Sequence, residues 1–234
     1  MKKILFSLLL IFVLIIGFLS YIGVVPFISP LITKPKDLGI KADPALVAAF
    51  DIAHEMKNEL PDGKIPADRE PEYEGSKKLD IKVSSAEITS ILAYWKNQYS
   101  KSPIRDVQVR INDDGTGEVS GILELSTAIM LAKQLDYSDE DIEKGKSYVK
   151  YVAGDLPFYM TGVANVKNNQ VTLSPTTVEI GRVALPESLV APVSSAVADV
   201  IERRMSKVTN LDVQELTLEP GGVHLVGTIP DTVK

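Results

Sequence analysis

The stretch IRDVQVRINDDGTGEVSG, from Ile104 to Gly121, decides the fold because the end of the chain contains a second version of it. The second version is LDVQELTLEPGGVHLVG, from Leu211 to Gly227. Aligned without a gap, the two stretches share five identical residues. Asp106, Val107, Gln108, Gly115 and Gly121 of the first correspond to Asp212, Val213, Gln214, Gly221 and Gly227 of the second. Alternating apolar residues around a glycine-containing turn are typical of a β-hairpin, so the sequence predicts two similar hairpins.

A helical pattern that contains Ser-Ser-Ala precedes each hairpin, beginning at Ser84 and at Ser194. Ser84 is followed three residues later by Glu87, which is the signature of a capping box at a helix start. We therefore predict a helix-plus-hairpin unit that is used twice, over residues 84–125 and 194–230.

The rest of the chain adds strands and helices to these two units. The predicted elements are a helix from Asp43 to Leu60, a strand at 79–83, two helices within 126–152 that are separated at Ser138, strands at 163–166 and 171–173 around Asn168-Asn169, and a strand at 177–184. In the second hairpin the apolar alternation slips between Val213 and Leu216, which predicts a β-bulge. Because short turns favour antiparallel pairing, we expect an α+β fold, with a twisted antiparallel sheet packed on helices.

The segment from Ile4 to Val25 contains no charged residue, and its 22 residues would span about 33 Å as a helix. A cleaved signal peptide is the competing interpretation. The apolar run is longer than a usual signal peptide requires, and no small-residue cleavage site follows it. We expect an N-terminal transmembrane signal anchor at residues 1–25, with the amino terminus in the cytoplasm and the main domain outside the cell membrane.

Four regions follow from this organisation. They are the anchor at 1–25, a proline-containing stalk at 26–42, a membrane-proximal helix and loop at 43–78, and an extracytoplasmic α+β domain at 79–234. Residues 1–36 hold four of the 25 basic residues and no acid, so the remainder carries 21 basic against 31 acidic residues, a formal charge of −10. A domain of this charge has no general attraction for nucleic acid or for an anionic membrane surface, so we expect no nucleic-acid partner.

The sequence contains no motif that predicts catalysis, a metal site or a cofactor. It has no cysteine and two histidines, and His54 lies in HEMKNE, which lacks the second histidine of a zinc-protease motif. The run NDDGTGE, from Asn112 to Glu118, has too few oxygen ligands in the spacing of a calcium loop, and a hairpin turn explains it better. We therefore expect a protein that is not an enzyme. A hydrolase of envelope polymers is a third class that no motif favours.

Apolar residues at helical spacing give the ligand-binding hypothesis. The predicted lining of an apolar groove between the sheet and the helices is Ile91, Trp95, Tyr99, Val197 and Ile201. Packing in the core is the competing interpretation for Trp95 and Tyr99.

With the anchor and the paired units, the runs VEIGRVALPESL (178–189) and GGVHLVGTIP (221–230) make the chain similar to YpmS-like membrane-anchored extracytoplasmic proteins. More distantly, it resembles tubular lipid-binding domains. The likeness covers most of residues 79–230 and implies a strongly bent sheet that curls around a helix and leaves a groove for acyl chains. We therefore expect a lipid or another apolar envelope molecule as ligand. A protein-interaction or structural scaffold of the envelope, with a protein partner, is the alternative.

Overall fold

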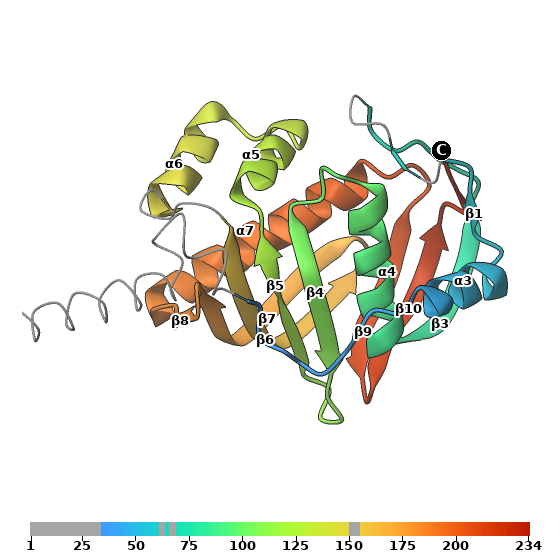
Figure 1. The fold of residues 1–234 in the computed structure, drawn as a ribbon, viewed down its shortest axis with the longest axis horizontal. Helices are drawn as coiled ribbons and strands as arrows, with labels where there is room; N and C mark the ends of the chain where they lie inside the picture. Colours follow the sequence, from blue (N-terminus) through green and yellow to red (C-terminus); the bar gives the residue numbers. More distant parts are fainter. Residues whose placement is uncertain (1–33, 61–63, 66–68, 150–154) are drawn as a thin grey trace, which may run out of the picture.

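The computed structural model describes residues 34–60, 64–65, 69–149 and 155–234 (Figure 1). The predicted membrane segment at residues 4–25 and the first part of the predicted stalk lie outside these residues. Within the described ranges, no helix combines the length and the apolar composition that crossing a bilayer requires. The fold is α+β with a mostly antiparallel sheet, as the sequence predicts.

The described helices are α3 (Pro44–Ala53), α4 (Ser85–Gln98), α5 (Leu125–Gln134), α6 (Asp139–Val149) and α7 (Glu187–Ser206). The strands of the main sheet are β3 (Lys77–Ser84), β4 (Ile104–Ile111), β5 (Gly117–Leu123), β6 (Leu156–Lys167), β7 (Gln170–Ile180), β8 (Val183–Ala184), β9 (Asp212–Glu219) and β10 (Gly222–Ile229). Three short strands form a second sheet among the described residues, in the order β1 (Lys57–Asn58), β11 (Thr232–Val233) and β2 (Tyr73–Glu74).

The long strand β6 organises the main sheet. It pairs with β7 along its length, and along its other edge it pairs first with β5, over Leu156–Gly162, and then with β9, over Asn165–Lys167. The hairpins β4–β5 and β9–β10 therefore lie next to each other on the same edge of β6, and β3 continues the sheet beyond β10. A side chain placed on Gly117, at the start of β5, would meet Leu218 of β9, so the two hairpins approach closely.

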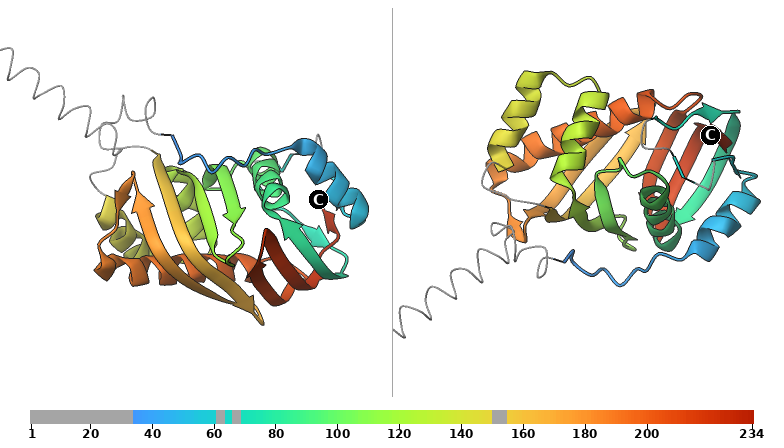
Figure 2. Two further views of the ribbon diagram at one scale, coloured as in Figure 1. Left: turned by 90° about the horizontal axis from the view of Figure 1, so that it is seen from below. Right: turned by 45° about the horizontal axis from the view of Figure 1, so that its top comes forward.

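The strand registers divide the side chains of this sheet into an apolar face and a polar face. The apolar face contains Val109, Ile111, Val119, Leu123, Leu156, Phe158, Met160, Val166, Val178, Leu216, Leu218, Val223 and Leu225. The polar face contains Gln108, Arg110, Glu118, Ser120, Tyr159 and Thr161. Figure 2 shows the curved sheet with α7 on one side and residues 34–43 on the other.

Helix α4 protects the outer edge of β4, which has no partner strand among the described residues. The backbone N–H of Ile111 donates to Ser85 Oγ at 2.9 Å, and that of Val109 donates to Thr89 Oγ1 at 3.0 Å. Both hydroxyl residues are buried. Two side chains of α4 thus accept hydrogen bonds from backbone N–H groups at the sheet edge, which would otherwise need a neighbouring strand.

Helix α7 lies along β7, at the opposite edge of the sheet. The carboxylate of Glu202 accepts a hydrogen bond of 2.7 Å from the backbone N–H of Val171, near the start of β7. Ser194, near the middle of the helix, is buried with 5% of its surface exposed. The face of α7 that carries Ser194 is therefore the face turned towards the sheet.

Residues 34–43, which we call the strap, cross the polar face of the sheet. Leu38 keeps only 2% of its surface exposed, and its backbone N–H donates to Gln108 Oε1 at 2.8 Å. The Lys36 ammonium lies 3.5 Å from the centre of the Tyr159 ring. The described part of the predicted stalk is thus packed against the domain.

The predicted start of the second repeat helix is wrong. The sequence places it at Ser194, whereas α7 begins at Glu187 after the extended residue Pro186. The helix therefore runs through Pro192, which lies in its second turn and removes one backbone hydrogen bond, to the carbonyl of Ser188. The two helix-plus-hairpin units consequently differ in the length of their helices.

Two other predicted boundaries are also wrong. The helix predicted from Asp43 to Leu60 ends at Ala53, because Glu55 adopts a φ of 50° and the following residues join the small sheet. The strands predicted at 171–173 and 177–184 are one strand, β7, which ends where Gly181 and Arg182 take φ values of 60° and 63°. Val183 and Ala184 then turn back to pair with its end as β8.

Candidate functional site

The inner face of α7 is apolar and incompletely covered. Val197 and Ile201 follow Ser194 by three and seven residues, so the three side chains share one helical face. Ser194 is buried, yet Val197 and Ile201 keep 36% and 38% of their surfaces exposed. The predicted groove residues on this helix therefore face the sheet without being covered by it.

The apolar face of the sheet shows the same incomplete cover. Leu156 and Val178 are buried, but Phe158, two residues after Leu156, and Met160, the register partner of Val178, are only half-buried. Partly exposed apolar side chains that gather on facing surfaces are typical of a site for an apolar ligand. The facing surfaces of α7 and β6–β7 therefore form the candidate ligand site.

The predicted groove residues on α4 have different surroundings. Tyr99 is buried in a cluster with Leu60 and Ile65, and Trp95 packs against that cluster. Ile91, one turn before Trp95, is half-buried. Tyr99 is thus a core residue at the end of α4, and the packing interpretation describes its position.

Arg204 links this cluster to α7. Its guanidinium carbon lies 5.2 Å from the centre of the Tyr99 ring, and its Nη1 lies 3.6 Å from Glu70, which accepts a hydrogen bond from the Tyr99 hydroxyl. Burial and the hydrogen bond to Glu70 raise the pKa of Tyr99. Arg204 thus joins the last turns of α7 to Tyr99 at the end of α4.

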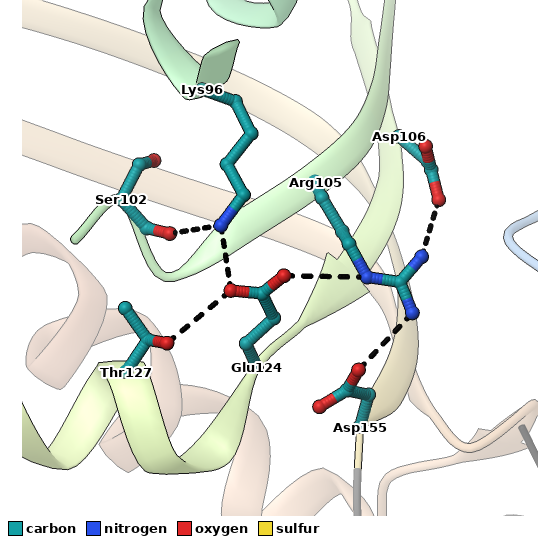
Figure 3. Close-up of polar contacts among 7 residues, drawn as sticks. All are labelled: Lys96, Ser102, Arg105, Asp106, Glu124, Thr127 and Asp155. Carbon is teal, nitrogen blue, oxygen red and sulfur yellow. Dashed lines mark hydrogen bonds and ion pairs between the residues drawn. The ribbon is translucent and has the colours of Figure 1, made fainter. Parts of the chain in front are cut away.

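A network of charged side chains lies at the start of β4 (Figure 3). Glu124 accepts from Lys96 Nζ at 2.6 Å and lies 3.4 Å from Arg105 Nε. Arg105 also contacts Asp106 at 2.6 Å and Asp155 at 3.1 Å. Two cations and three carboxylates are thus paired in one network with a formal charge of −1, which connects α4, β4, α5 and β6.

A cleft of about 520 Å³ lies next to this network, between the strap, α4 and β4. Its lining residues are Pro35, Ile40, Lys41, Ala42, Thr89, Ala93, Lys96, Asn97, Arg105, Asp106, Val107 and Gln108. Lys96 and Arg105 reach the cleft while already bound to carboxylates. This arrangement fixes segments of the fold, and it does not place a nucleophile beside a base.

The two histidines lie apart. His224 accepts or donates a hydrogen bond of 2.8 Å with Asp80, and this contact chiefly raises its pKa, whereas His54 lies against the Phe50 ring with a centroid separation of 4.5 Å. Within the described ranges, no group of three or more histidine and carboxylate side chains is placed to hold a metal ion.

Sequence reasoning missed Phe158 and Met160, although they belong to the candidate ligand site. The predicted strand begins at Val163, while β6 begins at Leu156. The missed signal is the alternation of Leu156, Phe158 and Met160, which is obscured because Pro157 and Tyr159 between them are also bulky and mostly apolar.

No protein-family model matches the chain, and neither the curated proteins nor the solved structures contain a significant match.

Proposed function

We propose that this chain is a membrane-anchored extracytoplasmic domain that binds a lipid or another apolar envelope molecule between α7 and the apolar face of the sheet. The observation that carries the proposal is the residual exposure of Val197 and Ile201 on α7, together with the half-buried Phe158 and Met160 on the apolar face of β6. Aliphatic and aromatic side chains on both surfaces match the acyl chain of a lipid.

The proposed location rests on the sequence. The uncharged run at residues 4–25 is long enough to span the hydrocarbon core as one transmembrane helix. Lys2 and Lys3 precede it, which favours a cytoplasmic amino terminus and an acidic domain outside the membrane. These residues would tether the domain to the outer surface of the membrane.

In the proposed architecture the second helix-plus-hairpin unit contributes a wall of the site, and the first unit stabilises the sheet beside it. The first unit is α4 with β4–β5, and the second is α7 with β9–β10. Their hairpins lie on the same edge of β6 and curve towards each other. The resemblance to YpmS-like proteins and tubular lipid-binding domains implies a bent sheet that holds acyl chains against a helix, and the proposal adopts that architecture.

Native mass spectrometry of the full-length chain, released from mild detergent, tests the proposal. The expected result is a population with one bound lipid or apolar molecule that survives removal of the detergent. The Ile201→Trp variant should fill part of the site and lower the bound fraction. Met130→Trp is the matched control, because Met130 is an exposed apolar residue on α5. Equal bound fractions in both variants, or no bound molecule in the parent chain, would contradict the proposal.

One feature favours the alternative role as a protein-interaction scaffold. Strand β3 pairs only with β10 among the described residues, so its outer edge is open to a strand from a partner. However, Lys78 and Lys82 are exposed on this strand, and lysines on an edge strand discourage such pairing. The lipid-binding function is therefore better supported.

A further inference from the structure

Helix α3 is apolar on almost all sides. Its sequence, PALVAAFDIA, contains one ionisable residue, Asp51. The inner side packs on α4 and buries Val47. The outer side is exposed and consists of Ala45, Ala48, Ala49, Ile52 and Ala53. Ile52 has 79% of its surface exposed, the largest value among the exposed large apolar residues of the described structure. A helix without a polar side is normally covered all round.

The position of α3 on the domain is fixed by its first residues. Asp43 caps the helix by accepting from the Ala45 N–H at 2.8 Å, and the N–H of Asp43 donates to Ser90 Oγ of α4 at 2.9 Å. The outer face of α3 therefore has a defined direction. Figure 2 shows α3 and the strap along the same side of the molecule.

The chain that precedes the strap sets how far this side can lie from the bilayer. Eight residues separate Val25, the end of the uncharged run, from Lys34, the first residue of the strap. Even when this segment is fully extended, the nine steps from Val25 to Lys34 span at most about 32 Å. The strap exposes Lys34, Lys36 and Lys41 against Asp37 and Asp43, so its net charge of +1 favours the anionic headgroups of a bilayer surface more than the acidic remainder of the domain does.

We propose that the outer face of α3 docks on the lipid bilayer and holds the strap side of the domain against the membrane. The inference rests on the proposed membrane anchor at residues 4–25, and it is independent of the proposed lipid site at α7. The bilayer is the occupant that the short tether, the exposed lysines of the strap and the uncharged outer face favour together. In the docked state Ile52 enters the boundary between headgroups and acyl chains, as in interfacial helices.

The absence of cysteine makes a site-specific test direct. A nitroxide on Ile52→Cys, in the full-length chain inserted into nanodiscs with anionic and zwitterionic phospholipids, reports the contact of residue 52 with lipid. Met130→Cys is the control, because Met130 is 51% exposed on α5, and α5 lies across the molecule from the strap in Figure 1. We expect the label at 52 to be relaxed by oxygen and protected from a water-soluble nickel complex, and the label at 130 to show the reverse.

Equal access of the nickel complex to both labels would overturn the docking proposal, provided that extraction at alkaline pH shows the chain to be membrane-inserted. If the chain is extracted, the anchor itself fails, and the docking proposal fails with it. A short distance between two labels at position 52 would show a second copy of the chain on α3 and would also overturn the proposal.

A second variant, Ala49→Asp, places a charge on the same face of α3. If the proposal holds, this variant should lower the docked-to-undocked ratio of the label at position 52 by about tenfold. Bound lipid at the α7 site should not change in that variant.

Discussion

Helices α4 and α7 protect opposite edges of the sheet, but α4 is more completely buried against its edge strand than α7 is. Helix α4 is joined to β4 by the buried hydroxyls of Ser85 and Thr89, and this seam excludes water. Helix α7 is joined to β7 by the half-buried carboxylate of Glu202, while Ile201 on its inner face stays 38% exposed. The first helix thus seals its edge, and the second leaves apolar surface available.

This difference suits α4 to stabilising the fold and α7 to binding a ligand. A buried hydrogen-bonded seam has little freedom to open, because each unpaired polar group inside it is costly. A helix that is hydrogen-bonded to β7 through Glu202 and keeps apolar side chains partly exposed can accept another apolar molecule at small cost. The account therefore assigns stability mainly to α4 and ligand binding to α7.

The largest expected loss of stability comes from removing a hydrogen bond between α4 and β4. Thr89→Val keeps the shape of the side chain but leaves the Val109 N–H without its acceptor, so the free energy of unfolding should fall by about 1–3 kcal/mol. Thr89→Ser keeps the hydroxyl and is the matched control. Urea titration followed by circular dichroism measures both. A loss in Thr89→Ser as large as that in Thr89→Val would contradict the assignment of the stability to the hydrogen bond.

A smaller effect is expected at the α7 edge. Glu202→Ala removes the acceptor of the Val171 N–H, which lies at a half-buried position, and should lower the free energy of unfolding by about 1 kcal/mol. Glu202→Gln keeps an acceptor oxygen and should lose less. The same urea titrations measure this effect, and a loss larger than that of Thr89→Val would reverse the comparison between the two helices.

Truncating the binding face should change stability least. Ile201→Ala should cost less than about 1 kcal/mol of unfolding free energy, well below the usual 2–5 kcal/mol for a buried isoleucine. The same variant should lower the fraction of chain that carries a bound apolar molecule. A stability loss typical of a core residue would show that α7 is packed as tightly as α4.

The junction between the helix ends gives a dependence on pH. Burial acts to raise the pKa of Glu70, but the hydrogen bonds from Tyr99 and Lys101 and the nearby cations outweigh it and lower the pKa below its ordinary value of 4.5. A lowered pKa means that Glu70 stabilises the fold above the unfolded-state pKa, and that this contribution is lost as pH falls through the folded-state pKa. The difference in urea midpoint between the parent chain and Glu70→Gln should therefore be present at pH 7 and disappear on acidification below 4.5. A difference that persists in acid would contradict this assignment.

Local sequence signals predicted much of the sheet. The capping box of Ser84 and Glu87 is present at the start of α4, and Asn168 and Asn169 turn between β6 and β7 with φ values of 50° and 64°. The bulge predicted between Val213 and Leu216 is confirmed, because Gln214 is left over where the register of β9 and β10 shifts. These features depend on neighbouring residues, so their signals are contained in short stretches.

The repeated glycines also have a local explanation in the structure. A Cβ on Gly227 would lie 2.2 Å from the backbone oxygen of Asp212, and one on Gly121 would lie 3.2 Å from the backbone oxygen of Arg105. Both glycines face the first strand of their hairpin beside its register shift. They serve close packing, as expected for a matching position in two hairpins.

The candidate site was only partly predictable. Helical spacing places Val197 and Ile201 on one face, but it does not say how completely another element covers that face. Tyr99 has the same kind of spacing and is nevertheless buried, because Leu60 and Ile65 from a distant loop pack on it. The network around Arg105 likewise joins residues from four separate segments, which no local pattern relates.

Photo-crosslinking tests the central claim most directly. A phospholipid with a diazirine on its acyl chain is added to membranes that contain the full-length chain, and the labelled peptides are mapped by mass spectrometry. The account predicts labels on α7 around Val197 and Ile201 and on β6 around Phe158 and Met160, reduced by Ile201→Trp. Labels confined to other parts of the chain, with none on α7 or β6, would contradict it.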